Sequence, residues 1–373
     1  MRIAVNTRLL LKNKLEGIGW FSYETLKRIT RRHPEHEFYF IFDRKYSDEF
    51  IFSGNVTPVV AFPPTRHPVL TEFYFRHVLP IVIKKIKADL FFSPDGWVPV
   101  KSPVPVHAVI HDLNFEHFPF FMPRYAHRHF TKCFPQYARR ADRIATVSEY
   151  TKQDIVSTYG ISPEKIDVVY NGANELYVPL PGKEQENIRK EFTGGAPYFI
   201  FVSSIHPRKN LENTLKAFFK FKDDTGRHTK FVIVGSVMWK SSALKKIIAN
   251  SKYQEELIFT GHVPVETLHK LIASAEALVY VSFFEGFGIP ILEAMRCGTP
   301  VITSNVTSMP EVAGDAALTV SPHDYEEIAQ AMKKIFSDND LRINLQAKGL
   351  SRSKEFSWDR TANLLWNSIN KLL

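Results

Sequence analysis

The sequence predicts an α/β protein made of two doubly wound parallel-sheet domains of similar size, and three observations lead to this prediction. The chain has 373 residues, more than one ordinary domain needs. Short runs rich in β-branched and aromatic residues alternate with amphipathic segments almost from end to end, which is typical of βα units. A single stretch rich in Pro, Gly and charged residues interrupts this alternation near the middle.

The strands expected in the first half are short, and several are apolar on both faces, as buried parallel strands are. They are Arg2–Asn6, Glu37–Phe42, Val56–Ala61, Asp89–Ser93, Val104–Ile110, Arg143–Val147 and Ile166–Tyr170. Amphipathic helices lie between them, and one of these carries an aromatic stripe from Phe130 to Ala141 with a kink expected at Pro135. We interpret such stripes as core packing rather than as a cofactor site.

The interruption at residues 178–197 predicts a linker between a first domain at residues 1–177 and a second at residues 198–356. A second series of strands follows it. The expected strands are Tyr198–Val202, Lys230–Val234, Leu257–Thr260, Ala277–Val281, Pro300–Thr303 and Ala317–Val320. Residues 357–373 form one further amphipathic segment. Parallel sheets bind ligands at the carboxyl ends of their strands, so the functional residues are expected there.

The composition excludes several classes of protein. Hydrophobic residues make up 44% and charged residues 23%, which is typical of folded globular chains and excludes disorder. Because Asn6 and Arg8 interrupt the apolar N-terminal run, and no run of about 18 apolar residues occurs, we expect neither a secretion signal nor a membrane span. With Cys133 and Cys297 as its two cysteines, the chain is expected to be cytoplasmic and to hold no metal.

The net charge of +9 points to an anionic partner, which could be nucleic acid, an acidic membrane or a phosphorylated substrate. Up to Tyr177 there are 24 basic and 18 acidic residues, a charge of +6, so most of the excess lies in the first domain. The sequence carries no aromatic RNA-binding motif, and we therefore expect no nucleic-acid partner.

The segment from Ser282 to Glu293 is the most informative for function. A buried strand leads into Glu285, two glycines flank Phe287, and Pro290 suits the first turn of a helix. Gly288 allows a close backbone approach, and the unpaired amides at a helix start attract anions. Glu285 in the loop and Glu293 in the first helical turn could each bind hydroxyl pairs of a sugar and a ribose. The alternative is a tight turn with a glutamate that satisfies the helix dipole.

A second cluster, from His206 to Asn210, lies between an apolar strand and a helix. Arg208 and Lys209 would stand at the carboxyl edge of the second sheet, with Asn210 as the N-cap. A planar guanidinium and an ammonium together suit a diphosphate. The alternative is a solvated pair of surface cations.

The first domain offers two weaker signals. Gly17 and Gly19 precede a helix, but the third glycine of a dinucleotide-binding fingerprint is missing, so an NAD site is not expected. His111, beside Asp112, ends a strand that we expect to be central, which places an imidazole at the functional edge of the sheet. The alternative is a structural histidine.

Taken together, these segments resemble the retaining glycosyltransferases of family 4, also called group 1, which have the GT-B fold of two Rossmann-like domains. The resemblance runs through GIG, VIHDL, ADRIATVSEYTKQDI, VVYNGAN, SSIHPRKNLENTLKAF, GHV, EGFGIPILE and AMRCGTPVITSNVTSMPEVAGDAAL. It covers nearly the whole chain, and its motifs are most specific in the second half. One departure is Ser204, at a position where many relatives have an arginine.

The resemblance implies a role for each candidate residue. Arg208 and Lys209 would hold the donor diphosphate, Glu285 the transferred sugar and Glu293 the ribose. The backbone of Phe287, Gly288 and Ile289 would face sugar and phosphate, that of His262 and Val263 the base, and Gly19 the phosphate from the first domain. His111 would act near the reacting centre. The final segment would be a helix that crosses back to the first domain.

The implied reaction transfers a sugar from a nucleotide diphosphate to an acceptor hydroxyl with retained configuration, without a metal or other cofactor. The segment SSIHPRKNL is similar to that of mannosyltransferases, so GDP-mannose is the first expected donor and a UDP-sugar the alternative. The acceptor would be a glycan or a lipid-linked sugar of a surface polysaccharide or glycolipid. A catalytically silent subunit that binds the sugar nucleotide is another alternative.

Peripheral attachment to an anionic membrane is a further hypothesis. Lys84, Lys85 and Lys87 end an apolar segment, and the cations from Arg124 to Arg140 decorate the following long helix. Such surfaces dock on acidic lipid and could reach a lipid-linked acceptor. The alternative is an ordinary basic face over core aromatics.

Overall fold

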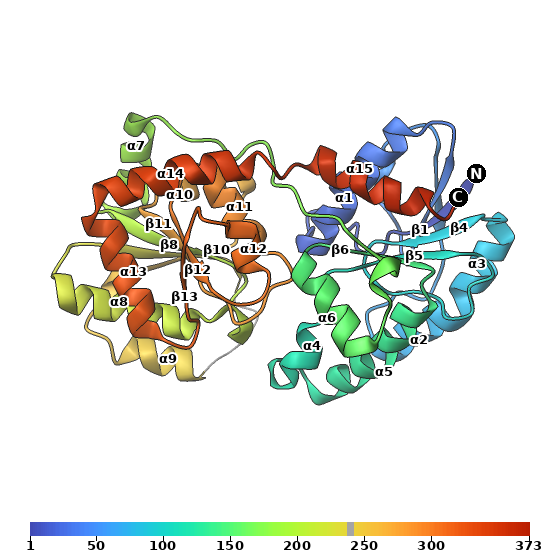
Figure 1. Ribbon diagram of the computed structural model, residues 1–373, viewed down its shortest axis with the longest axis horizontal. Coiled ribbons are helices and arrows are strands. Elements are labelled where there is room, and N and C mark those ends of the chain that lie inside the picture. The colour runs from blue at the N-terminus through green and yellow to red at the C-terminus, as the bar shows by residue number, and fades with distance from the viewer. Residues whose placement is uncertain (237–241) are drawn as a thin grey trace. The chain divides into compact units, whose positions relative to one another are not determined.

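The computed structural model describes residues 1–236 and 242–373, which form two compact units (Figure 1). The first unit combines residues 1–172 with residues 357–373, and the second comprises residues 173–356. Each unit holds one parallel sheet with helices on its faces.

The first sheet has seven strands in the order β3-β2-β1-β4-β5-β6-β7. Their bounds are β1 Arg2–Asn6, β2 Glu37–Phe42, β3 Val56–Val60, β4 Leu90–Ser93, β5 Val106–Ile110, β6 Arg143–Thr146 and β7 Ile166–Val168. The chain moves outward from β1 to β3 and then returns to the other side of β1 at β4. The switch point of this sheet, where open α/β sheets bind ligands, therefore lies between β1 and β4.

The helices of the first unit cover the sheet and bury its apolar side chains. They are α1 Gly17–Arg32, α2 Pro68–Phe73, α3 Leu79–Ile86, α4 Asn114–His117, α5 Arg124–Arg140, α6 Glu149–Tyr159 and α15 Trp358–Asn370. A π-helical turn at Tyr74–Val78 joins α2 to α3, and short 3-10 turns occur at Asp48–Phe50, Pro119–Phe121 and Pro163–Lys165. Pro135 lies inside α5, and the aromatic stripe of that helix is part of the core, with Phe134 and Tyr137 buried.

The second sheet has six strands in the order β10-β9-β8-β11-β12-β13, so its switch point lies between β8 and β11. The strands are β8 Tyr198–Val202, β9 Lys230–Val234, β10 Leu257–Gly261, β11 Ala277–Tyr280, β12 Val301–Ser304 and β13 Leu318–Val320. The helices are α7 Gly182–Thr193, α8 Leu211–Thr225, α9 Ser242–Ala249, α10 Val265–Ala273, α11 Ile289–Arg296, α12 Met309–Ala313, α13 Tyr325–Ser337 and α14 Asn339–Ser353. Two short 3-10 turns lie at Pro207–Lys209 and Gln254–Glu256.

The predicted strands are all present, each end within two residues of its expected position. The expected linker at residues 178–197 is not one, because it contains α7 and belongs to the second unit, which begins at Ala173. Among the side chains of α7, Ile188 and Thr193 are buried. A helix with so narrow an apolar stripe shows little of the periodicity by which helices are recognised in a sequence.

The last helix, α15, belongs to the first unit and packs along α1 (Figure 1). Thr361 donates to the carbonyl of Tyr170 at 2.6 Å, and the ring of Trp366 stacks on His33 with centroids 3.9 Å apart. Where the chain enters this helix, a Cβ on Gly172 would lie 2.3 Å from the backbone nitrogen of Trp358. Glycine is therefore required at position 172.

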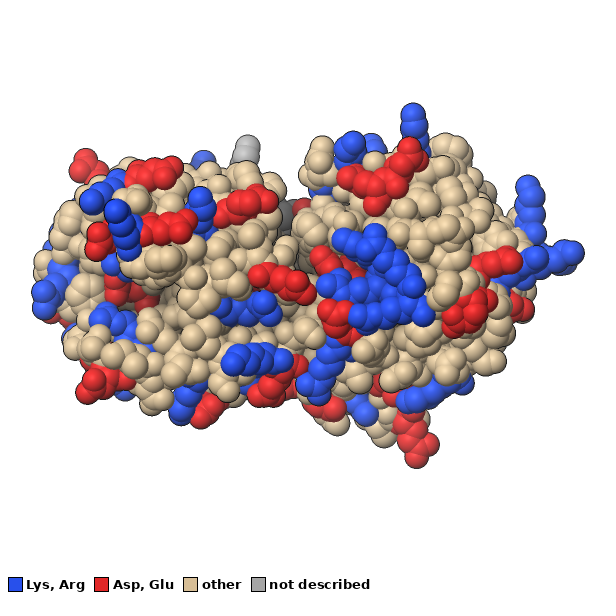
Figure 2. Space-filling model, turned by 90° about the horizontal axis from the view of Figure 1, so that it is seen from above, with Lys and Arg blue, Asp and Glu red and all other residues tan. Residues whose placement is uncertain are grey.

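Charges of both signs are interspersed on the face shown in Figure 2. Over α1 and α15, for example, Arg28 and Arg32 both pair with Asp359. In the described part of the chain, no helix is long and apolar enough to cross a membrane.

Candidate functional site

The loop between β8 and α8 places two cations at the carboxyl edge of the second sheet. Pro207–Lys209 form a 3-10 turn, whose start is capped by the imidazole of His206 accepting from the amide of Arg208 at 3.2 Å. Asn210 is the N-cap of α8, as expected, but its side chain makes no capping hydrogen bond to the helix. Its backbone is left-handed with φ 58°, and its amide group donates to the carbonyls of Val281 and Pro322 instead.

Both cations converge on Glu285, whose loop follows β11 on the other side of the switch point. Lys209 Nζ lies 2.6 Å from one carboxylate oxygen, and Arg208 Nη1 lies 3.1 Å from the other. Glu285 is 6% exposed. The hydroxyl of Tyr280 joins the cluster, since it donates to Glu285 at 3.0 Å and accepts from Lys209 at 2.8 Å.

The charges of this cluster keep Glu285 ionised. Burial alone would raise the pKa of its carboxyl group, but the adjacent Lys209 and Arg208 outweigh burial and hold the pKa at about 2. Two cations and one carboxylate leave a formal charge of +1, which suits an incoming anion. Burial raises the pKa of Tyr280 well above its usual value, so its hydroxyl remains a hydrogen-bond donor.

The Glu285 loop is fixed to its neighbours by backbone contacts. Ser308 donates to the carbonyl of Glu285 at 2.9 Å, and Arg208 donates to that of Phe284 at 2.6 Å. Phe287 is buried and packs edge-on against Phe356. Gly288, at φ +94°, is the N-cap of α11, and a Cβ there would lie 3.0 Å from Ile291. The first amides of α11, from Ile289 onward, are therefore presented beside this loop.

Glu293 lies in the second turn of α11, not in the first as expected, because the helix begins at Ile289. It is partly buried, and the hydroxyl of Tyr177 hydrogen-bonds to it. Burial raises the pKa of Glu293 to about 7, although the hydrogen bond from Tyr177 opposes that shift. A carboxyl group in this state readily changes its charge near neutral pH.

The other predicted positions of the second unit lie outside this cluster. His262, which is exposed, and Val263 follow β10 and precede α10. They are at the same carboxyl edge of the sheet as Lys209 and Glu285, because all these strands are parallel.

The two predicted residues of the first unit lie at the carboxyl edge of its own sheet. His111 directly follows β5, and its Nε2 is 2.8 Å from the carbonyl oxygen of Pro94. Its ring meets Phe21 edge-on at 4.9 Å, and burial lowers its pKa, so the imidazole is neutral. Gly17 and Gly19 form the first turn of α1 rather than preceding it, and a Cβ on Gly19 would lie 3.1 Å from the carbonyl of Leu9.

Sequence reasoning missed two residues of the site. Tyr280 was assigned to a buried strand, and its position at the end of that strand could have indicated a functional hydroxyl. Gly235 directly follows β9, and a glycine at the end of a strand could have indicated a close approach between two backbones. Its φ is +140°, and a Cβ there would lie 2.0 Å from the carbonyl oxygen of Ser203. The β9 loop can therefore approach the loop after β8 only with glycine at this position.

Among the described residues, no cluster of three or more His, Cys, Asp or Glu side chains could hold a metal ion. Asp338-Asn339-Asp340 has the D-x-D form of some metal-binding motifs, but Asp338 caps α14 by accepting from the amide of Leu341, and Asn339 and Asp340 lie in the first turn of that helix.

Two parallel-sheet units, with a cationic cluster that suits an anion at the switch point of the second, are typical of the GT-B class of glycosyltransferases. Comparison with family models agrees. Residues 183–352 match the model of "Glycosyl transferases group 1", and residues 15–175 match that of "Glycosyltransferase Family 4". The chain belongs to this family of glycosyltransferases.

Individual proteins show the same relationship. The chain is 28% identical to O-antigen chain mannosyltransferase B of Escherichia coli, over 97% of this chain and 98% of the relative. It is 32% identical to O-antigen chain mannosyltransferase RfbU of Salmonella typhimurium, over 53% of this chain and 52% of the relative. The crystal structure of HepE from Anabaena, in complex with UDP and glucose, superposes with a TM-score of 0.77 at 15% identity and covers 99% of both chains.

Proposed function

We propose that this glycosyltransferase transfers a mannosyl residue from a nucleotide-diphosphate donor to a hydroxyl group of a glycan in surface polysaccharide synthesis. The observation that carries the proposal is the buried cluster of Arg208, Lys209 and Glu285 beside the start of α11. It combines cations for a diphosphate with a carboxylate for sugar hydroxyls. The two relatives above are mannosyltransferases of O-antigen chains, which supports mannose as the sugar and a glycan as the acceptor.

Each residue of the cluster has a task in the proposed mechanism. Lys209, Arg208 and the first amides of α11 stabilise the negative charge that develops on the departing diphosphate. Glu285, fixed by Tyr280 and by the two cations, accepts hydrogen bonds from the transferred sugar. Because the departing phosphate also accepts the proton of the acceptor hydroxyl on the same face, the configuration is retained. The proposal requires neither a metal nor another cofactor, since fixed cations offset the diphosphate charge.

The remaining predicted residues would complete the donor and reaction sites. We assign Glu293 to the ribose hydroxyls, the backbone of His262 and Val263 to the base, and that of Phe287 and Gly288 to sugar and phosphate. Gly19 would approach the phosphate, and the neutral imidazole of His111 would act at the reacting centre. GDP-mannose is the first donor to test, and UDP-sugars are second because the HepE structure contains UDP.

The decisive experiment is radiolabel transfer, with and without acceptor, from a panel of GDP- and UDP-sugars. The expected result is turnover with GDP-mannose and a loss of at least a hundredfold in Glu285→Ala, because that change removes the sugar contact and leaves two partly buried cations without their carboxylate. Exposed Glu191→Ala, on α7 of the same unit, is the matched control. Donor binding without turnover from any donor would favour the silent-subunit alternative and overturn the proposal.

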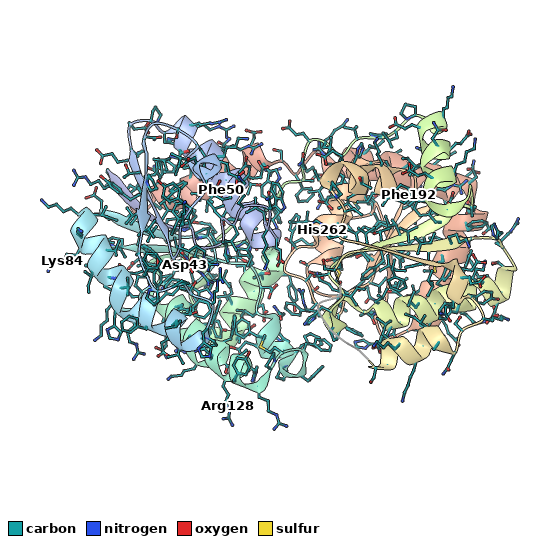
Figure 3. All side chains as sticks on the ribbon, turned by 180° about the vertical axis from the view of Figure 1, so that it is seen from behind. Asp43, Phe50, Lys84, Arg128, Phe192 and His262 are labelled. Carbon is teal, nitrogen blue, oxygen red and sulfur yellow. The ribbon has the colours of Figure 1, made fainter. Side chains whose placement is uncertain are left out.

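We also propose that the first unit attaches peripherally to anionic membranes through α2 and α3. Val69 and Ile81 are 67% and 69% exposed, and Phe73 is also exposed. Lys84 and Lys85 follow on the exposed face of α3, and Figure 3 shows Lys84 and Arg128 pointing away from the unit. Apolar side chains beside exposed cations are the combination that binds acidic lipid surfaces.

Co-sedimentation with phosphatidylglycerol vesicles tests this attachment. Binding is expected at low salt, and should weaken at high salt and in the double variant Ile81→Ser, Lys84→Glu. The matched control is Ile343→Ser, which changes an exposed isoleucine of the second unit. Failure to sediment at low salt would rule the attachment out. A parallel filter-binding assay with nucleic acid should detect no salt-dependent binding.

A further inference from the structure

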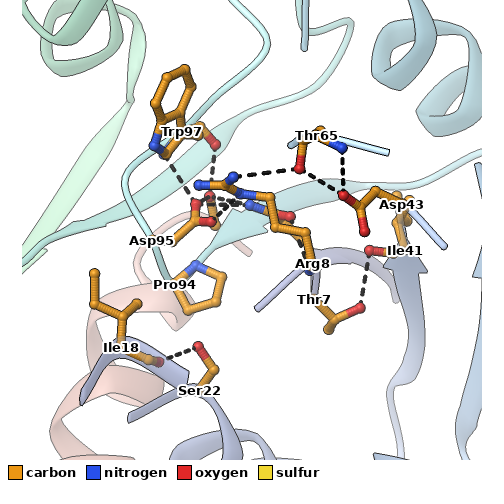
Figure 4. Close-up of polar contacts among 12 residues, drawn as sticks. Thr7, Arg8, Ile18, Ser22, Ile41, Asp43, Thr65, Pro94, Asp95 and Trp97 are labelled. Carbon is orange, nitrogen blue, oxygen red and sulfur yellow. Dashed lines mark hydrogen bonds and ion pairs between the residues drawn. The ribbon is translucent and has the colours of Figure 1, made fainter. Parts of the chain in front are cut away.

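A polar cluster lies at the switch point of the first sheet, separate from the residues assigned above. Arg8 follows β1, Asp95 follows β4 and Asp43 follows β2, so three charged side chains meet at the carboxyl ends of neighbouring strands (Figure 4). This is the edge at which open α/β sheets bind ligands.

Asp95 is held firmly within the cluster. One of its oxygens accepts from Asn6 at 2.8 Å, from Ser93 at 3.0 Å and from the amide of Trp97 at 3.2 Å. The other lies 2.5 Å from Nε of Arg8. The side chain of Asp95 is 3% exposed, so its hydrogen-bonding capacity is used inside the protein.

Arg8 is held mainly through Nε, the guanidinium nitrogen nearest to its alkyl chain. Its Nε pairs with Asp95, and its Nη1 lies 3.4 Å from the hydroxyl of Thr65. The guanidinium lies over the rings of Trp97 and Phe75, 5.2 and 5.7 Å from their centroids, which fixes its plane. Among the described residues, these contacts leave most of the N–H donors of the terminal fork unused, and the side chain is 13% exposed.

Tyr74 provides a second, independent observation. Its side chain is fully buried, yet its hydroxyl has no hydrogen-bond partner among the described residues. Tyr74 is next to the cluster, because its ring meets that of Phe75 edge-on, with centroids 5.5 Å apart, and the guanidinium of Arg8 lies over the same Phe75 ring. A buried hydroxyl without a partner is costly, so a ligand that hydrogen-bonds to it would relieve this cost.

The charge of the cluster narrows the class of ligand. Asp43 is paired with Arg44 at 2.6 Å and also accepts from the amide and hydroxyl of Thr65. Two carboxylates and two guanidiniums make the cluster formally neutral. A neutral site with unused donors suits a hydroxyl-bearing ligand better than a phosphate, which would need an excess of cations.

We propose that Arg8 and Tyr74 form a subsite for a neutral sugar of the acceptor, in which the terminal N–H groups of Arg8 donate to adjacent sugar hydroxyls. The proposal rests on the function proposed above, because a glycan acceptor supplies such a sugar. Asp95 positions Arg8, and Asn6 with Ser93 positions Asp95. The planar fork is essential here, since an ammonium cannot donate in parallel to two adjacent oxygens.

Saturation-transfer NMR on the full chain, with methyl α-mannoside and with mannose 1-phosphate as separate probes, tests the subsite directly. Arg8→Lys keeps the charge beside Asp95 but removes the fork, and Tyr74→Phe removes one hydroxyl. The matched control is Arg143→Lys, because Arg143 forms a similar half-buried pair with Asp167 at the opposite, amino end of β6.

The expected result is binding of methyl α-mannoside to the wild type and to Arg143→Lys, with about tenfold weaker binding in Arg8→Lys. GDP binding, measured on the same samples, should be unchanged in all variants. Wild-type affinity for methyl α-mannoside in both Arg8→Lys and Tyr74→Phe would overturn the subsite, and so would an equal loss in Arg143→Lys. Mannose 1-phosphate also fits the donor site at Arg208 and Lys209, so its binding bears on the subsite only through the difference between the wild type and Arg8→Lys. Because sugar binding is measured without donor, a failure of transfer activity would be recognised separately.

Discussion

Glu293 shows how one buried carboxyl group links stability to pH. Its folded pKa of about 7 lies above the ordinary value of 4.5, so between these values the folded state binds more protons than the unfolded state. The stability that this group contributes is complete below pH 4.5 and is lost as the pH rises through 7. The same carboxyl becomes a charged acceptor for ribose hydroxyls only as it loses this proton.

We therefore predict that Glu293→Gln stabilises the protein at pH 8 by up to about 3 kcal/mol and has almost no effect at pH 4.5. Urea unfolding at the two pH values measures this. Exposed Glu191→Gln should change stability at neither pH. Equal stabilities of wild type and Glu293→Gln at pH 8 would contradict the prediction.

A second prediction for a single residue concerns Gly235→Ala. Alanine there would bring Cβ within 2.0 Å of the Ser203 carbonyl, at a φ that side chains rarely adopt. We expect a loss of more than about 3 kcal/mol in unfolding free energy. Gly226 has φ +62° and open space around it, so Gly226→Ala tests the unfavourable backbone conformation without a steric clash. It should lower the unfolding free energy by about 1 kcal/mol. Chemical denaturation of both variants measures the difference, and similar losses would refute the steric argument.

At the scale of elements, α15 completes the first unit. It is attached to the sheet through Ser368, which is 2.8 Å from His107 Nε2 and donates to Asp167 at 2.6 Å. Burial lowers the pKa of His107 to about 3, so its imidazole is neutral in this contact. The helix therefore fixes the sheet as well as covering α1.

We predict that Trp366→Ala destabilises the first unit by about 3 kcal/mol, because it removes a 9%-exposed aromatic side chain between α15 and His33. Thermal unfolding followed by circular dichroism measures the loss. Trp20→Ala, on α1 of the same unit but 38% exposed, should cost less than about 1 kcal/mol. If Trp366→Ala destabilised the unit no more than Trp20→Ala does, the contact of α15 with His33 would contribute little to its stability.

Elements were also the level at which the sequence was most informative. Strands such as Tyr198–Val202 are buried along their whole length, so an unbroken apolar run marks them. Helix α7 lacks such a signal. The Lys209 and Glu285 motifs were recognisable because each is local. The Arg8–Asp95 pair was not, because it joins residues 87 positions apart and depends on β1 lying beside β4.

At the scale of the whole molecule, the two units can be observed separately. Four of the five tryptophans, Trp20, Trp97, Trp358 and Trp366, belong to the first unit, and the fifth is Trp239. Trp239→Phe therefore makes tryptophan fluorescence a reporter of the first unit, whereas circular dichroism reports both units.

We predict that GDP at a hundred times its Kd stabilises the second unit by about 3 kcal/mol and raises its unfolding temperature by several degrees. In Trp239→Phe, fluorescence follows the unfolding of the first unit alone, so its transition temperature should rise much less than that of the second unit, which circular dichroism detects. Lys209→Met should abolish the shift. A nucleotide effect confined to the fluorescence transition would place the donor diphosphate in the other unit.

The composition of the first unit from two separate segments has a consequence for synthesis on the ribosome. Residues 173–356, the entire second unit, are made before the seventeen residues that supply α15. The second unit can therefore fold while the chain is still growing, but the face of α1 that receives Trp366 stays uncovered until residues 357–373 have been made. The first unit thus finishes folding after the second, although most of it is made earlier, and its uncovered α1 face is where a chaperone would act in the interval.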